Sequence, residues 1–338
     1  RDAATPTAIG SLGVQLDTNI VYQGTALVAG SWTNTNKLNV SRTIFVDYVN
    51  GKDSGTSIGL PQRADRPFLT KAAAITSALT LSRTSTNRVM INVAMGESTE
   101  AIAFTATSLG IDFNLNGGSL LVSSGSTAGI SDGGFACDSV IYNAGLIQRS
   151  SGASNGYAIS VTHASSTIVV NALNVTGFFT VPTVNISAGT LILNSKVTGG
   201  SSAVQNVIQV SGGTFILNGN TISTNTGATV GVVISAGTAT INGDVTVSGD
   251  NAISITGGTL TMNGSRIQTV TAAKNAIKND AGTLKLMSCH VAAGAGAFSV
   301  DSIGAEDVLL YGACSQNLAA DGTTTFIGST IVTNVLLT

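Results

Sequence analysis

VNISAGTLILNSKV, beginning at Val184, is the first of five aligned copies of one pattern, and these copies decide the fold of the chain. The other four align with it without gaps: IQVSGGTFILNGNTI from Ile208, VISAGTATINGDV from Val233, ISITGGTLTMNGSRI from Ile253 and IKNDAGTLKLMSCHV from Ile277. Each copy holds a glycine before its central run, at spacings of 24, 24, 21 and 24 residues: Gly189, Gly213, Gly237, Gly258 and Gly282. Such a period is typical of a solenoid, in which each unit stacks on the one before it.

Each copy combines strand alternation with turn chemistry. In GTLILN, Leu191 and Leu193 point to one side of an extended strand, while Thr190 and Ile192 point to the other. The preceding glycine supplies the positive φ of a bend, and the asparagine that ends the run tolerates the left-handed region. One unit therefore consists of a strand, a glycine turn, a second strand, an Asn-Gly or Asn-Ser turn and a third strand.

An asparagine follows the shared glycine by five residues in four of the copies: Asn194, Asn218, Asn242 and Asn263. One unit upstream, VTHASSTIVVNALNV places Ser166 in the glycine position and Asn171 in the asparagine position. Units stacked about 4.8 Å apart would bring these amides together as a ladder. The alternative is ordinary turn chemistry in each unit, with no contact between the amides.

Weaker copies near Gly118, Gly145, Glu306 and Gly322 extend the pattern. The period is too short for ankyrin or tetratricopeptide units, and the spacings of leucine-rich and calcium-binding RTX repeats are absent. We therefore predict an all-β parallel solenoid with three-strand coils of about 21–27 residues and one continuous apolar core. We expect six residues to lie on or beside one parallel sheet, with one alternate set facing inward: Leu191, Leu193, Ile216, Ile241, Leu260 and Leu284.

A second signal lies ahead of the coils. IFVDYVNGKDSGTS (44–57) is followed by DRPFLTKAAAITSAL (65–79) and RVMINVAMGESTE (88–100). Pro67 precedes a run of good helix formers, which predicts a leading strand, a polar loop, a short helix and the first coil strand. A helix there would cover the open apolar end of the coil stack.

The order FVD-x-x-NG-x-D, RPF-x-T with an Ala-rich helix, and V-x-I-x-V-x-x-G resembles the pectate-lyase-like right-handed parallel β-helix superfamily. That superfamily includes polysaccharide lyases and hydrolases, and also phage tailspikes and tail fibres, which this chain resembles most in character. The resemblance covers residues 44–338 and implies a right-handed β-helix, with the leading strand and capping helix in 44–87 and the coils in 88–338. Residues 1–43 fall outside it, and we expect them to form a strand-rich attachment or capping segment. The superfamily includes both catalytic and non-catalytic proteins with this fold, so the resemblance does not identify an activity.

Composition narrows the function classes. Only 9% of the residues are charged and the net charge is −2, so we expect neither nucleic-acid binding nor attraction to anionic membranes. No run of 18 apolar residues predicts a membrane helix. A surface of hydroxyls and amides with few charges suits an extracellular or virion-surface protein.

Glycoside hydrolysis requires paired carboxylates, and the repeat register predicts which residues lie beside each acidic side chain on neighbouring coils. It places Asn220 and Ser265 beside Asp244, Thr226 and Thr271 beside Asp250, and Thr256 and Gly304 beside Asp280. The densest acidic position, Glu306–Asp307, has adjacent side chains that point to opposite faces, so it predicts a solvated turn rather than a catalytic pair.

The candidate metal ligands and thiols are also separated along the repeat. His163 and His290 fall on different sides of different coils, without a third ligand. Cys289 and Cys314 are 25 residues apart, a spacing that permits a disulfide between neighbouring coils, but we expect buried free thiols. We predict no catalytic, cofactor-binding or metal-binding residues and no cofactor.

The favoured function is a structural virion surface protein, tail fibre-like or tailspike-like, that binds a host glycan or receptor. The alternatives are a secreted polysaccharide lyase or hydrolase and, last, a cellular adhesin or ice-binding surface, since Thr238/Thr240 and Thr259/Thr261 form paired threonines in one slot of adjacent coils.

The tail from Ile327 ends in an uncharged apolar run, so we expect either further chain or a partner subunit to cover it. The expected partners are a homo-oligomer, by resemblance a trimer, other virion proteins at residues 1–43, and a host glycan or receptor.

Overall fold

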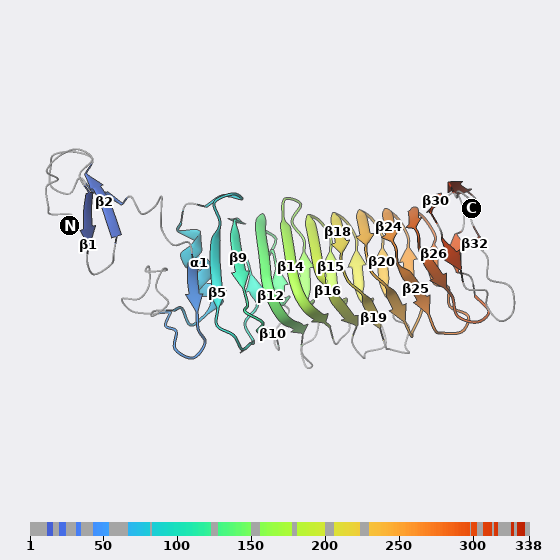
Figure 1. The fold of residues 1–338 in the computed structure, drawn as a ribbon, viewed down its shortest axis with the longest axis horizontal. Coiled ribbons are helices and arrows are strands. Elements are labelled where there is room, and N and C mark those ends of the chain that lie inside the picture. Colours follow the sequence, from blue (N-terminus) through green and yellow to red (C-terminus); the bar gives the residue numbers. More distant parts are fainter. Residues whose placement is uncertain are drawn as a thin grey trace.

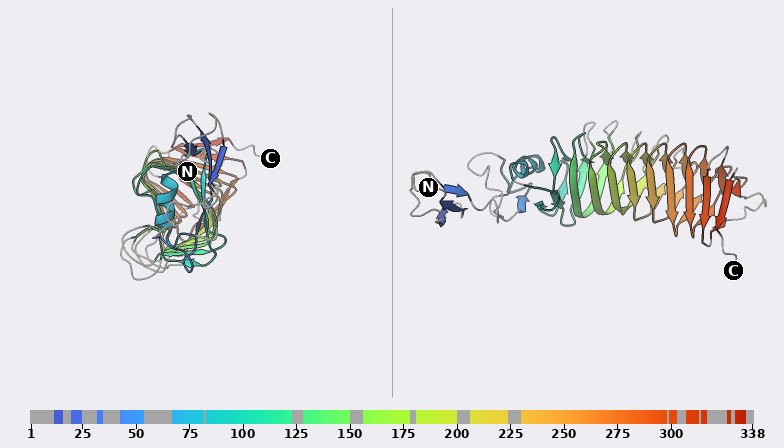
Figure 2. Two further views of the ribbon diagram at one scale, coloured as in Figure 1. Left: turned by 90° about the vertical axis from the view of Figure 1, so that its left-hand side faces the viewer. Right: turned by 90° about the horizontal axis from the view of Figure 1, so that it is seen from above.

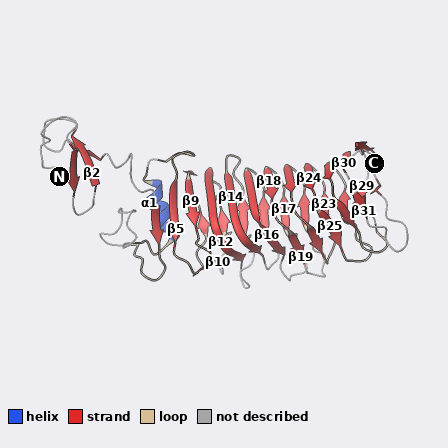
Figure 3. Cartoon of the chain, in the orientation of Figure 1, coloured by secondary structure: helices blue, strands red, loops and turns tan. Residues whose placement is uncertain are grey.

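The computed structural model describes residues 12–15, 20–24, 32–34, 43–53, 67–81, 83–122, 128–149, 156–177, 181–199, 206–223, 230–297, 299–302, 307–312, 314–316, 326–327 and 330–334. Over most of these residues the chain forms a parallel β-solenoid of about eight turns (Figure 1). Strands make up nearly all of its regular structure (Figure 3), and the coils superpose when viewed along the long axis (Figure 2, left). The predicted parallel solenoid is confirmed.

The strands that carry the repeated G-T-L-x-L pattern stack in register. β16 (Thr190–Gly199) pairs in parallel with β18 (Thr214–Leu217), so that Leu191 lies beside Phe215 and Leu193 beside Leu217. We call these strands the repeat-strand series, and its other members are β4 (Thr43–Val46), β5 (Val89–Val93), β9 (Ile111–Asn114), β12 (Cys137–Arg149), β14 (Thr167–Thr176), β21 (Thr238–Ile241), β24 (Thr259–Asn263), β27 (Thr283–Met287), β30 (Asp307–Tyr311) and β33 (Thr330–Asn334).

A second series follows the asparagine turn. Its later members are β19 (Thr221–Ser223), β22 (Val245–Val247), β25 (Arg266–Thr269), β28 (His290–Ala292) and β31 (Ser315–Gln316). Its earlier members are the C-terminal halves of β12, β14 and β16, preceded by β10 (Ser119–Val122) and β6 (Glu97–Ser98), and β8 (Ser108–Leu109) pairs with the start of β12. Because β12, β14 and β16 run through the turn, both series belong to one 20-stranded sheet.

The third series forms a separate 10-stranded parallel sheet. Its strands are short: β7 (Ile102–Ala103), β11 (Ile130–Ser131), β13 (Ile159–Val161), β15 (Val184–Ile186), β17 (Ile208–Val210), β20 (Val232–Ile234), β23 (Ile253–Ile255), β26 (Ile277–Asn279), β29 (Val300–Ser302) and β32 (Phe326–Ile327). Apart from the solenoid, β1 (Leu12–Gln15), β2 (Ile20–Gly24) and β3 (Trp32–Asn34) form an antiparallel three-stranded sheet.

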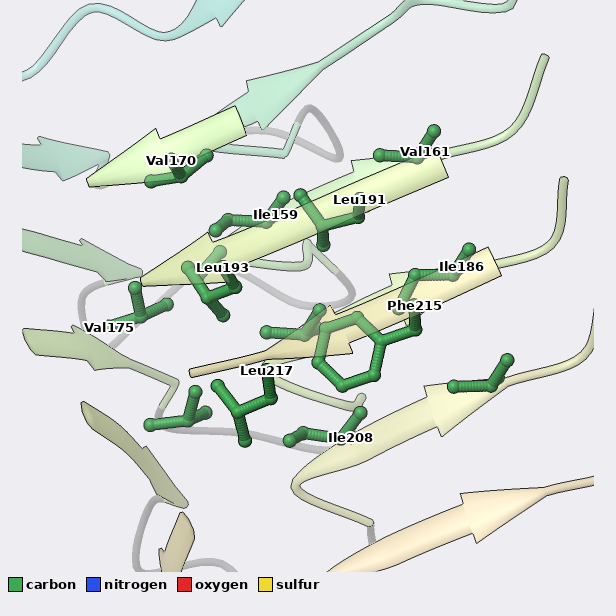
Figure 4. Packing of buried hydrophobic residues seen from close by; sticks show 14 of the residues in the cluster. Ile159, Val161, Val170, Val175, Ile186, Leu191, Leu193, Ile208, Phe215 and Leu217 are labelled. Carbon is green, nitrogen blue, oxygen red and sulfur yellow. The ribbon is translucent and has the colours of Figure 1, made fainter. Parts of the chain in front are cut away.

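The core is a set of apolar rows that run through the stack. Leu191, Leu193, Phe215 and Leu217 face the short strands that carry Ile186 and Ile208 (Figure 4). Of the six residues expected on or beside the sheet, five are fully buried: Leu191, Leu193, Ile241, Leu260 and Leu284. Ile216 is on the sheet but points to the opposite side and is only partly buried, because it occupies the alternate position of its strand.

The predicted short helix is present as α1 (Lys71–Leu79), at the end of the stack that holds β4 and β5 (Figure 1). Thr70 caps its N-terminus, because its Oγ1 accepts a hydrogen bond from the Ala73 amide at 3.2 Å. The Glu100 carboxylate accepts two more, from the Lys71 amide at 2.6 Å and the Ala72 amide at 2.8 Å. A carboxylate at this position also complements the positive end of the helix dipole.

Candidate functional site

One regular surface of the solenoid is the outward side of the repeat strands β14, β16, β18, β21, β24 and β27, which we call the Thr–Asn face. Its first row consists of stacked threonines: Thr167, Thr190, Thr214, Thr238, Thr259 and Thr283. Its second row, two residues further along each strand, changes from aliphatic to polar along the stack: Val169, Ile192, Ile216, Thr240, Thr261 and Lys285. The paired threonines noted in the sequence occupy only the two coils of β21 and β24.

The third row of the face is the predicted asparagine ladder. Each amide nitrogen donates to the amide oxygen one coil earlier, at 2.6 Å for Asn194 to Asn171 and 2.7 Å for Asn218 to Asn194. The ladder continues at 2.7 Å from Asn242 to Asn218 and at 2.6 Å from Asn263 to Asn242. These distances confirm a ladder through five coils, and the alternative of separate turns without contact is wrong here.

The ladder ends at Asn263, whose buried Oδ1 has no hydrogen-bond partner within the described part of the chain. The next coil places Met287 in the asparagine position, and this methionine is 43% exposed. A donor at position 287 would therefore meet an unsatisfied acceptor.

We expect Met287→Asn to stabilise the protein by about 1 kcal/mol, because the new Nδ2 donates to Asn263 Oδ1 and satisfies a buried acceptor. Met287→Leu is the matched control, since it replaces the same exposed side chain without adding a donor. Chemical denaturation should give a higher free energy of unfolding for the asparagine variant only. Equal values for the two variants would contradict an open ladder end.

A surface depression of about 380 Å³ lies at the earlier end of the Thr–Asn face. Its lining is uncharged: Gly117, Asn143, Ala144, Gly145, Asn171, Ala172, Leu173 and Asn194. The register shifts here between Ile141 and Ala144 of β12 and between Asn171 and Asn174 of β14, as in a β-bulge. The extra residue of β14 relative to β16 leaves the Leu173 side chain 81% exposed above small neighbours.

The described residues that line this depression offer amides and small or aliphatic side chains, with no group for acid–base chemistry among them. Three asparagine amides line it together with glycine, alanine and the exposed Leu173. Asn143 donates to Asn114 at 3.1 Å and Asn171 donates to the Ile141 carbonyl at 3.3 Å, which holds both amides in place. The repeat pattern in the sequence does not predict this site, although the NALN segment (171–174) differs from the shorter NS and NG turns of later coils.

The expected separation of the acidic residues needs two corrections. Asp244 lies beside Arg266 rather than Ser265, because β22 pairs Val245 with Ile267, and the Arg266 amide donates to Asp244 Oδ1 at 2.8 Å. The coil that contains Arg266 carries one more residue between its asparagine, Asn263, and the following strand than the coil of Asp244 does, and this extra residue shifts the register. Asp250 and Asp280 form ion pairs at 2.9 Å: Asp250 with Lys274 and Asp280 with Lys278.

Against the second part of that expectation, one carboxylate pair does lie on neighbouring coils, outside the regular repeat. Asp112 in β9 and Asp138 in β12 lie on neighbouring coils, and Arg88 binds both. Arg88 donates through Nε and Nη2 to Asp112 at 2.7 Å and 2.5 Å, and through Nη1 to Asp138 at 2.9 Å. Hydrogen bonding to Asp112 is the main effect that raises the pKa of Arg88. Only the three-dimensional register of the irregular early coils brings these residues together.

The other sequence candidates lie apart. His163 Nδ1 accepts from the Ser165 amide at 3.1 Å, while His290 is bonded to Ser315 Oγ at 2.9 Å on a later coil. Among the residues that the structure describes, no group of three potential ligands could hold a metal ion. Glu306 and the side chain of Asp307 lie outside the described residues, as do Thr226 and Gly304. No described helix is long and apolar enough to cross a membrane.

A buried cationic cluster joins α1 to the first coils. Lys71 is fully buried, and its Nζ donates to Tyr48 OH at 2.8 Å and to Ser98 Oγ at 2.5 Å. Burial lowers the pKa of Lys71 to about 8, against the opposing effect of Glu100. Burial also raises the pKa of Tyr48 to about 12. Burying the charged form of Lys71 costs desolvation free energy. This cost opposes the stabilisation that its hydrogen bonds give to the packing of α1 against the first coils.

We expect Lys71 to contribute a rise in the free energy of unfolding on the order of 2 kcal/mol between pH 8 and pH 10, because unfolded lysine still binds a proton that folded Lys71 has lost. The buried thiols of Cys137 and Cys289 have raised pKa values and act in the opposite direction over the same range. Above pH 10 the raised pKa of Tyr48 acts in the opposite direction, since the tyrosine ionises first in the unfolded chain. Urea titrations at pH 8 and pH 10 on the unaltered protein and on Lys71→Met would isolate the contribution of Lys71, because the thiols act equally in both. The change in the free energy of unfolding from pH 8 to pH 10 should be more favourable in the unaltered protein by on the order of 2 kcal/mol, and equal changes would assign the effect to other groups.

Comparisons with known proteins add no family to this description. No protein-family model matches the chain, and neither the curated proteins nor the solved structures gave a match.

Proposed function

We propose that the chain is a right-handed β-helix with three strands in each coil, capped by α1, and that it is a tail fibre-like or tailspike-like virion surface protein that binds host glycans. The hand follows from the strong preference of parallel strand crossovers. The buried face of α1 supports the capping role, because Ala74, Ile75 and Ala78 join the solenoid core at its first coils.

The observation that carries the proposal is the uncharged depression on the Thr–Asn face. Asparagine amides offer both donors and acceptors to sugar hydroxyls, while an exposed leucine offers an apolar surface to the C–H face of a sugar ring. Because no charged side chain lines the site, we expect a neutral saccharide as ligand. Affinity for one copy would be modest, and several copies on one particle would raise it by avidity.

Leu173→Ala tests the site with little risk to folding, since the side chain is already 81% exposed. We expect a neutral bacterial surface glycan identified on a glycan array to lose about tenfold in affinity, which corresponds to about 1.4 kcal/mol. Val270→Ala, an exposed aliphatic position on a later coil, is the matched control and should bind normally. Binding should change little with salt, because screening acts on charges. No binding to any glycan, or equal binding by both variants, would contradict the proposal.

A polysaccharide lyase or hydrolase is the second candidate, and the Arg88–Asp112–Asp138 cluster is the observation that favours it. A basic residue between carboxylates on neighbouring coils is one arrangement that such enzymes use. However, Arg88 forms ion pairs with both carboxylates, and Asp112 is only 3% exposed. We expect no release of oligosaccharides from host polysaccharides. Release that disappears in Asp138→Asn, with folding unchanged, would favour the enzyme.

The proposed partners follow from the same assignment. A virion fibre would be a homo-oligomer, by resemblance a trimer of side-by-side solenoids, with residues 1–43 attached to other virion proteins. Part of the C-terminal run on which that expectation also rested lies outside the described residues. Light scattering on the purified chain tests the assembly, and a monomer at micromolar concentration would favour the adhesin alternative over a fibre.

A further inference from the structure

Ser265, Cys289 and Cys314 occupy one column at the turn after the repeat strands. The Cys289 thiol donates to the Met262 and Met287 carbonyls, both at 3.4 Å. The Cys314 thiol donates to the Leu286 and Tyr311 carbonyls, also at 3.4 Å. Since Met262 pairs with Leu286 and Met287 with Tyr311, the two thiols make the same contacts one coil apart.

The backbone confirms that these two cysteines are direct neighbours. The Ser315 amide donates to the Cys289 carbonyl at 2.9 Å, and the following residues pair as His290 with Ser315. Adjacent parallel strands place equivalent Cα atoms about 4.8 Å apart, inside the range of about 4.4–6.8 Å that a disulfide spans. Equivalent positions also give parallel Cα–Cβ directions, so the two Cβ atoms lie about 4.8 Å apart and have to approach by a few tenths of an ångström to reach the separation of about 3.5–4.5 Å in a disulfide.

The two thiols differ in their exposure to solvent. Cys289 is buried, whereas Cys314 is partly exposed, and both are free in this structure. Burial raises the pKa of Cys289, which suppresses attack by that sulfur on a reagent in solution. An oxidant would therefore meet Cys314 first.

We propose that Cys289 and Cys314 are a redox-sensitive pair that closes into a coil-to-coil disulfide on exposure to a small-molecule disulfide such as oxidised glutathione. The Cys314 thiolate attacks the oxidant and forms a mixed disulfide, which releases one glutathione thiol. Cys289 then gives up its proton and attacks the Cys314 sulfur, which releases the second glutathione thiol. The protein loses two electrons and two protons, and the oxidant gains them. The new bond joins the coil of β28 to that of β31.

The test uses the reduced chain of residues 1–338, incubated with oxidised glutathione and then denatured and alkylated. We expect one alkylated cysteine, Cys137, a mass lower by two hydrogen atoms before alkylation, and a cross-linked peptide pair containing positions 289 and 314. Amide exchange in β28 and β31 should also become slower in the oxidised protein. Cys137→Ser is the control and should form the same cross-link with no alkylated cysteine left.

Serine variants separate the formation of the mixed disulfide from the closure of the Cys289–Cys314 disulfide. They also keep a donor for the backbone carbonyls that the two thiols contact. Ser265 already occupies an equivalent site, where its Oγ donates to the Asn263 carbonyl at 3.0 Å and to the Ile241 carbonyl at 3.5 Å. Cys289→Ser should stop at a stable glutathione adduct on Cys314, whereas Cys314→Ser should remain unmodified in the folded state. Three alkylated cysteines in the unaltered chain, a glutathione adduct that persists on Cys314, or a cross-link between two chains would overturn the proposal.

Discussion

Gly213→Ala is expected to destabilise the protein by on the order of 4 kcal/mol, among the largest effects of a single methyl group in this chain. Gly213 has a φ of 68°, a conformation that costs an L-residue about 1–2 kcal/mol. In addition, a Cβ at this position would overlap the Gly189 carbonyl oxygen and lie 2.6 Å from the Ala188 carbonyl carbon. Both atoms are backbone of the coil below, so no side chain can move aside and the coils themselves must separate.

Gly264→Ala separates the cost of the backbone conformation from the cost of the steric overlap between coils. Gly264 has a similar φ of 59°, but nothing lies within 4 Å of the position where its Cβ would be. This variant should lose only about 1 kcal/mol, from backbone conformation alone. Denaturation followed by far-ultraviolet circular dichroism compares the two proteins. Equal losses would mean that the close approach between coils contributes nothing, and the tight stacking described above would be wrong.

Phe215→Ala is expected to cost about 3–5 kcal/mol, because it empties the largest position of the central core row. Phe215 is fully buried and lies between Leu191 on one coil and Ala239 on the next. The small Ala239 leaves room for the ring, so truncation at 215 would put two alanines side by side. The surrounding backbone belongs to a hydrogen-bonded stack and cannot collapse into the space.

Ile216→Ala is the matched control on the same strand. Ile216 has the opposite orientation and is partly exposed on the Thr–Asn face, so we expect a loss of about 1 kcal/mol or less. Thermal unfolding of both variants would show the difference in midpoint directly. A larger loss for Ile216→Ala than for Phe215→Ala would reverse the assignment of the inner and outer sides of this sheet.

The oxidation, ladder and core predictions all depend on the register between neighbouring coils, and the sequence predicts that register well only where the repeat is regular. From β16 to β27 the glycine and asparagine positions align the units, and the paired residues agree with that alignment. In the earlier coils the bulges of β12 and β14 break the period. The Arg88–Asp112–Asp138 cluster and the depression beside Leu173 lie in or next to these irregular coils, which is why the sequence did not reveal them.

The sequence by itself determined that this chain is a parallel solenoid, because a period of 21–24 residues, with a glycine in each of the five copies and an asparagine in four of them, repeats the same turns from coil to coil. The sequence left open whether the asparagines stack, and the hydrogen bonds between their amides decided this. It did not determine which side of the repeat strands is the core, since Ile192 and Ile216 alternate with Leu191 and Phe215 and both sides carry apolar residues. Tertiary structure decided this, because the short strands of the third series approach from one side only and bury the rows that face them. It also decided where the surface has a depression and where charges meet, because both depend on how irregular coils shift against their neighbours rather than on any single unit.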